Sequence, residues 1–201
     1  PDVPHNEGSF RPVHVSAPEG SIHNALDPAP VASRQVIGHF IPSAIFAALT
    51  GALPGRLMAP GADPIWLSVW RGQNPPFTLT VFQVGGTGGR AGKDGLNAVG
   101  FPSGVAGVPA EVIESLSPIV MKRRQLRADS GGAGTWRGGL GQLTEFTRRG
   151  EGRWSVSSIA DRTEYPAPGL LGGDSGATGE VKLGDRTRLN AKAPKDLGQG
   201  E

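Results

Sequence analysis

Three dense clusters of glycine, at residues 85–95, 131–141 and 169–179, constrain this chain more than any other feature. Glycine has no Cβ, so it adopts positive φ angles readily and lets two backbones approach closely. The 201 residues include 32 glycines and 18 prolines, a content that can indicate disorder when apolar segments are scarce. Here clear apolar segments separate the clusters, so we expect a folded chain with long loops.

One helix and a strand pair give the clearest periodic signals. Apolar residues, among them Val36, Phe40, Ile45 and Leu49, recur at helical spacing and predict a helix over roughly 31–50. Pro42 lies inside this pattern and is expected to kink or split the helix. The sequence therefore predicts an α+β class, a strand-rich mixed fold with one principal helix and long glycine-rich loops.

Strand predictions rest on shorter signals. The alternation of threonine and apolar residues within 77–84 predicts a strand, and residues 65–70 are expected to form another, separated from it by the Gly/Pro-containing segment 72–76. Further expected elements are a short helix at 109–116 and strands at 10–15, 119–127, 141–147, 154–159 and 179–183. The polar tail from Asn190 is expected to be loose. No linker divides the chain, so residues 1–201 are expected to form a single domain or the C-terminal fragment of a larger subunit.

Composition excludes several classes of function. The net charge of +2 implies no strongly charged partner, and the absence of cysteine excludes disulfides, thiolate metal sites and cysteine nucleophiles. The longest apolar run, 44–53, is broken by Thr50 and Gly51 and is too short for a membrane span. We therefore expect no membrane association and a cytoplasmic location. The first residue is Pro1 rather than Met, and we expect the chain to be part of a longer protein.

The first glycine cluster follows a predicted strand, where phosphate-binding loops occur. It does not match a P-loop, because Gly92-Lys93 is followed by Asp94 instead of Ser or Thr. The competing interpretation is that its glycines serve close packing of loops and strands.

Other candidate motifs are weak. The four histidines, His5, His14, His23 and His39, match no metal-ligand pattern. Glu111 and Glu114 would share a helix face, as an acid–base pair or as solvated side chains. The basic run at 122–127 lacks the broad basic surface and the aromatic residues of a nucleic-acid site, so we expect no nucleic-acid partner and favour a solvated strand or a subunit contact.

Taken in order, several segments resemble the hydantoinase B family, which includes the second half of 5-oxoprolinases and the alpha-type subunit of acetone carboxylases. The resemblance is carried by residues 6–12, 17–21, 28–31 with Arg34, 85–88 with Arg90, Asp94 and Gly95, 100–104 with Pro109, Glu111 and Glu114, and 126–127, 129–134 and 137–141. Two positions depart from the family pattern: Gly89 stands where alanine is common, and His23 where an apolar residue is usual.

The resemblance implies a function shared between subunits. In this family a hydantoinase A-type partner uses ATP to phosphorylate the carbonyl oxygen of a cyclic amide, and the B-type subunit supports ring opening by water. The match covers only the later portion of family members. It therefore implies ATP with Mg in the partner subunit, a divalent metal in the part upstream of Pro1, and no cofactor bound by this chain alone. We expect the chain by itself to be inactive as a hydrolase.

The resemblance also directs attention to a set of candidate substrate-binding residues for a small cyclic amide: Arg34, Arg90, Asp94, Gly86 and Gly88. No catalytic residue is assigned. We predict that Arg90 and Asp94 face a cavity or a subunit seam; the alternative is an internal salt bridge that shapes the loop. Two other functions stay open, an acetone carboxylase-like subunit and a non-catalytic structural or interface fragment.

Overall fold

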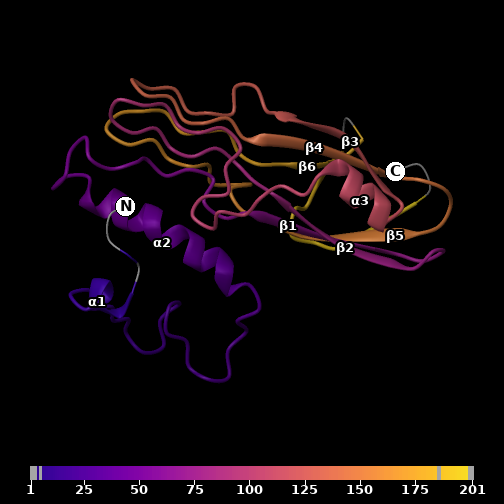
Figure 1. Ribbon diagram of the computed structural model, residues 1–201, viewed down its shortest axis with the longest axis horizontal. Coiled ribbons are helices and arrows are strands. Elements are labelled where there is room, and N and C mark those ends of the chain that lie inside the picture. The colour runs from indigo at the N-terminus through magenta and orange to yellow at the C-terminus, as the bar shows by residue number, and fades with distance from the viewer. Residues whose placement is uncertain (1–3, 5, 185–186, 199–201) are drawn as a thin grey trace. The chain divides into compact units, whose positions relative to one another are not determined.

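The computed structural model describes residue 4 and residues 6–184 and 187–198 (Figure 1). The chain separates into two compact units, Pro1–Arg34 and Gln35–Glu201. Within the described residues, no helix combines the length and the apolar character that a membrane span requires.

The N-terminal unit contains one short helix, α1 (Glu7–Phe10), whose N-cap is Asn6. The Asn6 side chain accepts a hydrogen bond from the Ser9 N–H at 3.1 Å, which satisfies a donor at the helix start. The predicted strand at 10–15 is wrong, because the chain turns after Phe10 and Val15 is 90% exposed. Alternating side chains form a strand only where a neighbouring strand and a core are available, and this segment has neither.

Helix α2 (Arg34–Leu49) confirms the predicted principal helix. Pro42 lies inside it without dividing it, so the expected split does not occur. The buried face differs from the apolar stripe seen in the sequence. Ser43 is buried, whereas Ile45 and Leu49 are exposed. A polar contact of Ser43 therefore helps to hold the helix in place.

The main sheet is antiparallel and has the order β2-β1-β5-β8. Its strands are β1 (Trp66–Gly72), β2 (Phe77–Gln83), β5 (Trp154–Ile159) and β8 (Lys195–Leu197). Strands β1, β2 and β5 confirm the sequence predictions. The expectation of a loose tail from Asn190 is wrong for β8, because this strand pairs with β5 and buries Leu197 in the core.

The remaining elements complete an α+β fold, as predicted. Helix α3 (Ala110–Leu116) precedes the antiparallel pair β3 (Ile119–Leu126) and β4 (Gln142–Arg148). A second small pair consists of β6 (Val181–Leu183) and β7 (Thr187–Leu189), of which β7 has no counterpart among the predicted strands.

Aromatic rings form the centre of the core. Trp70 on β1 stacks on Trp154 of β5 with ring centroids 5.3 Å apart, and it also contacts the ring of Phe146 of β4 at a centroid distance of 5.2 Å. Ile113 of α3 and Ile119 of β3 are fully buried in the same cluster. The core thus joins the main sheet to the β3–β4 pair. The glycine-rich loops extend from these packed strands.

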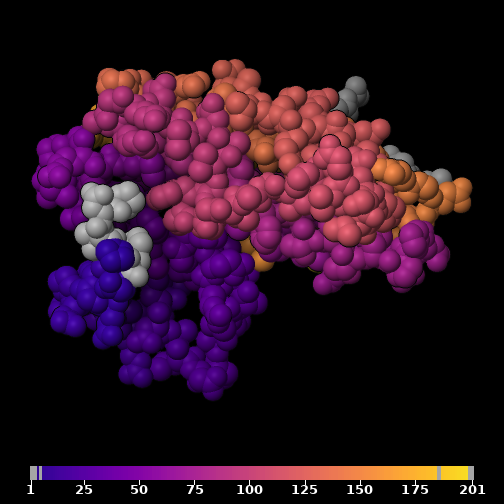
Figure 2. Space-filling view, viewed as in Figure 1, coloured from indigo at the N-terminus to yellow at the C-terminus, as the bar shows by residue number. Residues whose placement is uncertain are grey.

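The glycine clusters pack against one another, backbone to backbone. In Figure 1 their loops run side by side, and in Figure 2 the surface of this region is continuous. A Cβ on Gly86 would overlap the carbonyl oxygen of Gly139, and one on Gly88 would overlap that of Ala59. A Cβ on Gly132 would overlap the carbonyl oxygen of Asp174. These three glycines have no positive φ angle, so close approach, and not a special backbone conformation, is the reason for glycine here.

We predict that Gly88→Ala destabilises the full-length protein by about 1–3 kcal/mol or more, the usual cost of forcing an atom into a close-packed site. The rigid Ala59 carbonyl cannot yield without separating two hydrogen-bonded segments. The matched control is Gly38→Ala in α2, where a Cβ meets nothing within 4 Å; alanine there should stabilise the helix by about 0.5–1 kcal/mol. Urea unfolding of both variants measures the difference, and equal stabilities would contradict the packing argument.

Candidate functional site

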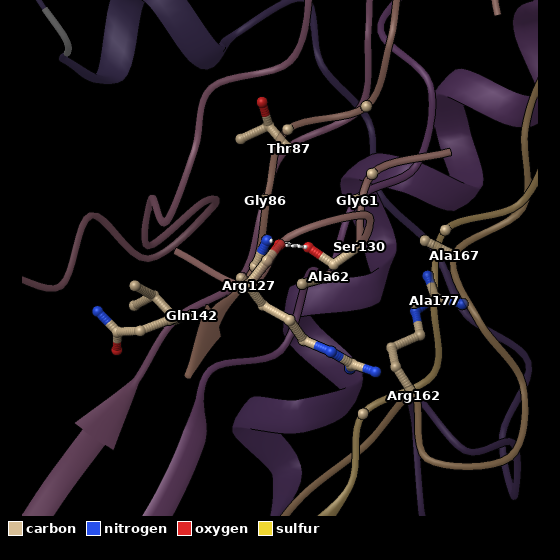
Figure 3. A pocket seen from close by; sticks show the side chains of 18 of the residues that line it. Gly61, Ala62, Gly86, Thr87, Arg127, Ser130, Gln142, Arg162, Ala167 and Ala177 are labelled. Carbon is tan, nitrogen blue, oxygen red and sulfur yellow. Dashed lines mark hydrogen bonds between the residues drawn. The ribbon is translucent and has the colours of Figure 1, made fainter. Parts of the chain in front are cut away.

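A large cavity of about 1280 Å³ lies in the Gln35–Glu201 unit. All three glycine clusters contribute to its wall, together with residues of β1, β4 and β5. Figure 3 shows part of it at close range, with Gly86 and Thr87 of the first cluster on one side, Ala177 of the third cluster on the other, and the lining side chains of Arg127 and Arg162. The loops that meet here are distant in sequence, so the cavity exists only because they pack together.

Arg162 is held at this wall by an ion pair. Its Nη2 lies 2.7 Å from Oδ2 of Asp63, whose side chain is 1% exposed. The other carboxylate oxygen of Asp63 accepts a hydrogen bond from the Ser43 hydroxyl of α2 at 2.6 Å. The guanidinium carbon of Arg162 also lies 4.7 Å from the centre of the Phe40 ring, within cation–π distance. One carboxylate therefore connects α2, the 61–64 segment and the chain after β5.

Both residues of this ion pair have left-handed backbone conformations. The φ angle is 56° at Asp63 and 59° at Arg162. Such angles are uncommon for residues other than glycine and cost free energy, so they persist only where surrounding contacts impose them. Aspartate tolerates this conformation better than arginine does. The strained backbone at Arg162 thus marks it as a residue whose placement is imposed by its contacts.

Arg127 and Ser130 organise the second side of the cavity. Nη1 of Arg127 donates to the Thr178 carbonyl at 2.6 Å, and Nη2 lies 3.6 Å from Glu180. The Ser130 hydroxyl donates to the Arg127 carbonyl at 2.7 Å (Figure 3) and accepts from the Gly141 N–H at 2.8 Å. Ser130 therefore closes the second glycine cluster as a hydrogen-bonded loop.

The structure brings together only part of the candidate set from the sequence. Gly86, Gly88 and Arg90 line the cavity. Asp94 is exposed and its carboxylate accepts a hydrogen bond from the Arg137 N–H at 2.8 Å, which joins the first two glycine clusters. Arg34 is exposed at the first residue of α2, whereas the cavity-lining residues begin at Thr50. No ion pair between Arg90 and Asp94 occurs among the described residues.

The first glycine cluster uses its own polar groups internally. The buried Thr87 donates its N–H to the Leu96 carbonyl at 3.0 Å, and its hydroxyl accepts from the Leu96 N–H at 2.8 Å. The Thr87 carbonyl in turn accepts from the Gly139 N–H. An anion-binding loop would turn successive N–H groups toward the ligand. The Thr87 amide is committed to the loop itself, which favours the packing interpretation of this cluster.

The other sequence motifs separate in space. Glu114 pairs with Arg149 at 2.6 Å and also accepts from the Met121 N–H, so it is not part of an acid–base pair with the exposed Glu111. Residues 122–125 are exposed on β3, as expected for a solvated strand. In the part of the chain that the structure describes, no three histidine, aspartate or glutamate side chains form a group that could hold a metal; His5 lies outside that part.

Sequence reasoning missed Asp63, Arg162 and Ser43. The two charged residues are 99 positions apart, and neither belongs to a motif with known spacing. Ser43 lies among apolar residues in the second half of α2, and this polar residue is the local signal for a buried contact.

We predict that Asp63→Asn lowers the free energy of unfolding by about 3 kcal/mol, the lower end for a buried ion pair that loses one partner, because Arg162 keeps some exposure. Asparagine also tolerates the left-handed backbone, so the change isolates the charge. The control is Glu145→Gln, which breaks the exposed ion pair with Arg123 and should cost at most about 1 kcal/mol. Similar losses in both variants, measured by chemical denaturation, would refute this role of Asp63.

Comparison with known proteins gives consistent matches. A family model described as hydantoinase B/oxoprolinase matches residues 1–201. The chain is 31% identical over 187 residues to the putative B-type subunit of a D-/L-hydantoinase from Pseudomonas sp. (strain NS671), covering 92% of this chain and 31% of that protein. It is 32% identical over 181 residues to the beta subunit of the caprolactamase from Pseudomonas jessenii, covering 84% of this chain and 31% of that protein.

A solved structure shares the fold. The crystal structure of the ATP-dependent caprolactamase from Pseudomonas jessenii matches with a TM-score of 0.80 and 24% identity, covering 98% of this chain and 38% of that one. The chain spans about a third of the length of the two curated relatives named above. Because the family model covers residues 1–201, the chain belongs to the hydantoinase B/oxoprolinase family.

Proposed function

We propose that this chain is part of the B-type subunit of an ATP-dependent amidohydrolase that opens a small cyclic amide, of the hydantoin or 5-oxoproline kind, in the cytoplasm. The observation that carries the proposal is the family match over residues 1–201. Two relatives, by their names the B-type subunit of a hydantoinase and the beta subunit of a caprolactamase, each refer to a cyclic amide. Both are parts of larger enzymes, which supports a hydantoinase A-type partner for this protein.

An unstrained amide is a poor electrophile, so water needs an activated carbonyl. Transfer of the γ-phosphoryl group of ATP to the amide oxygen would create a reactive imidate and release ADP. We assign ATP with Mg to the partner subunit. The described residues of this chain do not fit a metal site, and we assign them no part in activating water. Their proposed task is to bind and orient the ring.

The cavity supports this task. Its volume of about 1280 Å³ exceeds the size of common small-molecule pockets, about 300–1,000 Å³, and leaves room for a ring and for a segment of another chain. Arg90 lies at its wall beside Gly86 and Gly88. A guanidinium there would stabilise negative charge that develops on the substrate during attack by water. Arg34 and Asp94 are further candidates, and Asp94 would act by holding the loop through Arg137.

A non-catalytic, structural role is the second candidate. It is favoured by the internal use of polar groups in the first glycine cluster, where Thr87 and Asp94 hydrogen-bond within the loops. Exposed apolar side chains, such as Ile45 and Leu126, would then belong to contacts with other subunits. Kinetics of the assembled enzyme distinguish the two candidates.

The first test is reconstitution. The full-length protein and its A-type partner are mixed with ATP, Mg²⁺ or Mn²⁺, and hydantoin or 5-oxoproline, and the ring-opened acid is measured by chromatography. We expect product only when both proteins and ATP are present, and none from residues 1–201 alone. Product from residues 1–201 alone would refute the division of labour, and no product from the complete mixture would refute the proposed activity.

The second test concerns the cavity wall. In the reconstituted enzyme we expect Arg90→Ala to lower kcat/KM at least tenfold while the variant stays folded, because one charge-stabilising donor typically contributes a factor of that size or more. Arg188→Ala, which changes an exposed arginine bonded to the Thr163 carbonyl, is the control. If both variants keep the parental kcat/KM, the structural role is the better description of this loop.

A further inference from the structure

The ion pair at the cavity wall is asymmetric. Arg162 lines the cavity with a side chain that is 18% exposed, whereas Asp63 does not line it and is 1% exposed. The carboxylate therefore lies behind the wall and the guanidinium in front of it. A buried carboxylate is a costly way to attach a loop, because its desolvation offsets much of the Coulomb attraction. Its position is explained if it serves to present a cation to the cavity.

Arg162 is held in one orientation. Asp63 takes an Nη2 donor, the Phe40 ring lies against the guanidinium, and Nη1 is 3.4 Å from the Pro166 carbonyl. Nε is inaccessible to solvent and has no hydrogen-bond partner among the described residues. A guanidinium carries five N–H donors, so these contacts leave donors for a ligand in the cavity. A rigid, partly desolvated arginine is suited to bidentate binding of a planar or tetrahedral anion.

Arg127 provides a second cation at the same cavity. Both arginines line the cavity, and the N–H of Gly179, the residue after the carbonyl that Arg127 contacts, donates to the Arg162 carbonyl at 2.8 Å. The Thr178 carbonyl holds its Nη1, and Glu180 is only at 3.6 Å. Glu180 is itself closer to Lys182, at 3.1 Å. The negative charge near Arg127 is thus shared with a lysine.

We propose that Arg127 and Arg162 form an anion subsite that binds a carboxylate or phosphoryl group in this cavity, with Asp63 and Ser43 as positioning residues. The shared chemistry is an oxyanion with two or three acceptor oxygens, which matches the fork of donors on each guanidinium. The two sources are an acid group on the ring substrate and a phosphate. Binding of an acid group on the ring substrate rests on the proposed function, whereas binding of a phosphate does not.

Binding to the full-length protein, without ATP or the partner subunit, tests the subsite apart from activity. Isothermal titration calorimetry compares inorganic phosphate, 5-oxoproline and 2-pyrrolidinone; the last two differ in that only 5-oxoproline has a carboxylate. We expect saturable binding of phosphate or 5-oxoproline and at least tenfold weaker binding of 2-pyrrolidinone. Preference for phosphate identifies a phosphoryl subsite and preference for 5-oxoproline a carboxylate subsite. Failure of both anions to bind would overturn the proposal.

Variants locate the binding. Arg162→Gln and Arg127→Gln should each raise the anion Kd at least tenfold, since each loses a charge-assisted hydrogen bond. Arg149→Gln is the control, because it removes an arginine from the exposed pair with Glu114, outside the cavity lining. If Arg162→Gln does not fold, Arg127→Gln decides. Parental affinity in the folded cavity variants, or equal loss in Arg149→Gln, would overturn the subsite even if ring opening is observed.

Discussion

Close backbone contacts at glycine residues, which have no Cβ, hold the loop region together. Segments near Ala59, Gly88 and Gly139 approach one another so closely that a methyl group would overlap a carbonyl oxygen. Hydrogen bonds such as Ala59 N–H to the Gly89 carbonyl then satisfy polar groups that would otherwise be buried without partners. The part of the cavity wall that the glycine-rich loops form depends on this packing.

Close packing of glycine does not select which side chains face the cavity. Polar contacts between segments that are distant in sequence determine the orientation of these side chains. The carboxylate of Asp63 accepts from Ser43 in α2 and from Arg162 after β5, so it connects segments that the glycine contacts do not join. The left-handed backbone at both ion-pair residues shows that these contacts prevail over local conformational preference.

Family membership and site chemistry rest on different kinds of information. The order of short motifs along the chain is enough to indicate the family, and the family match over residues 1–201 agrees with it. The folded arrangement of these motifs places Gly86, Gly88 and Arg90 at the cavity, and provides Asp94 with a hydrogen bond that joins two loops. Their chemical roles are proposals, since a shared cavity wall does not by itself assign a reaction.

Sequence alone determined the elements whose signal is local. The helix over 34–49 and the strands at 77–83 and 154–159 follow from side-chain periodicity. This periodicity is a local property of the sequence and does not depend on which segments pack against it. Tertiary structure decided the rest. Strand β8 forms in a polar tail because β5 offers an open edge, and Asp63 meets Arg162 across 99 positions because folding brings them together. Such pairings form between residues that are close in space, and the number of residues between them along the chain does not predict that closeness.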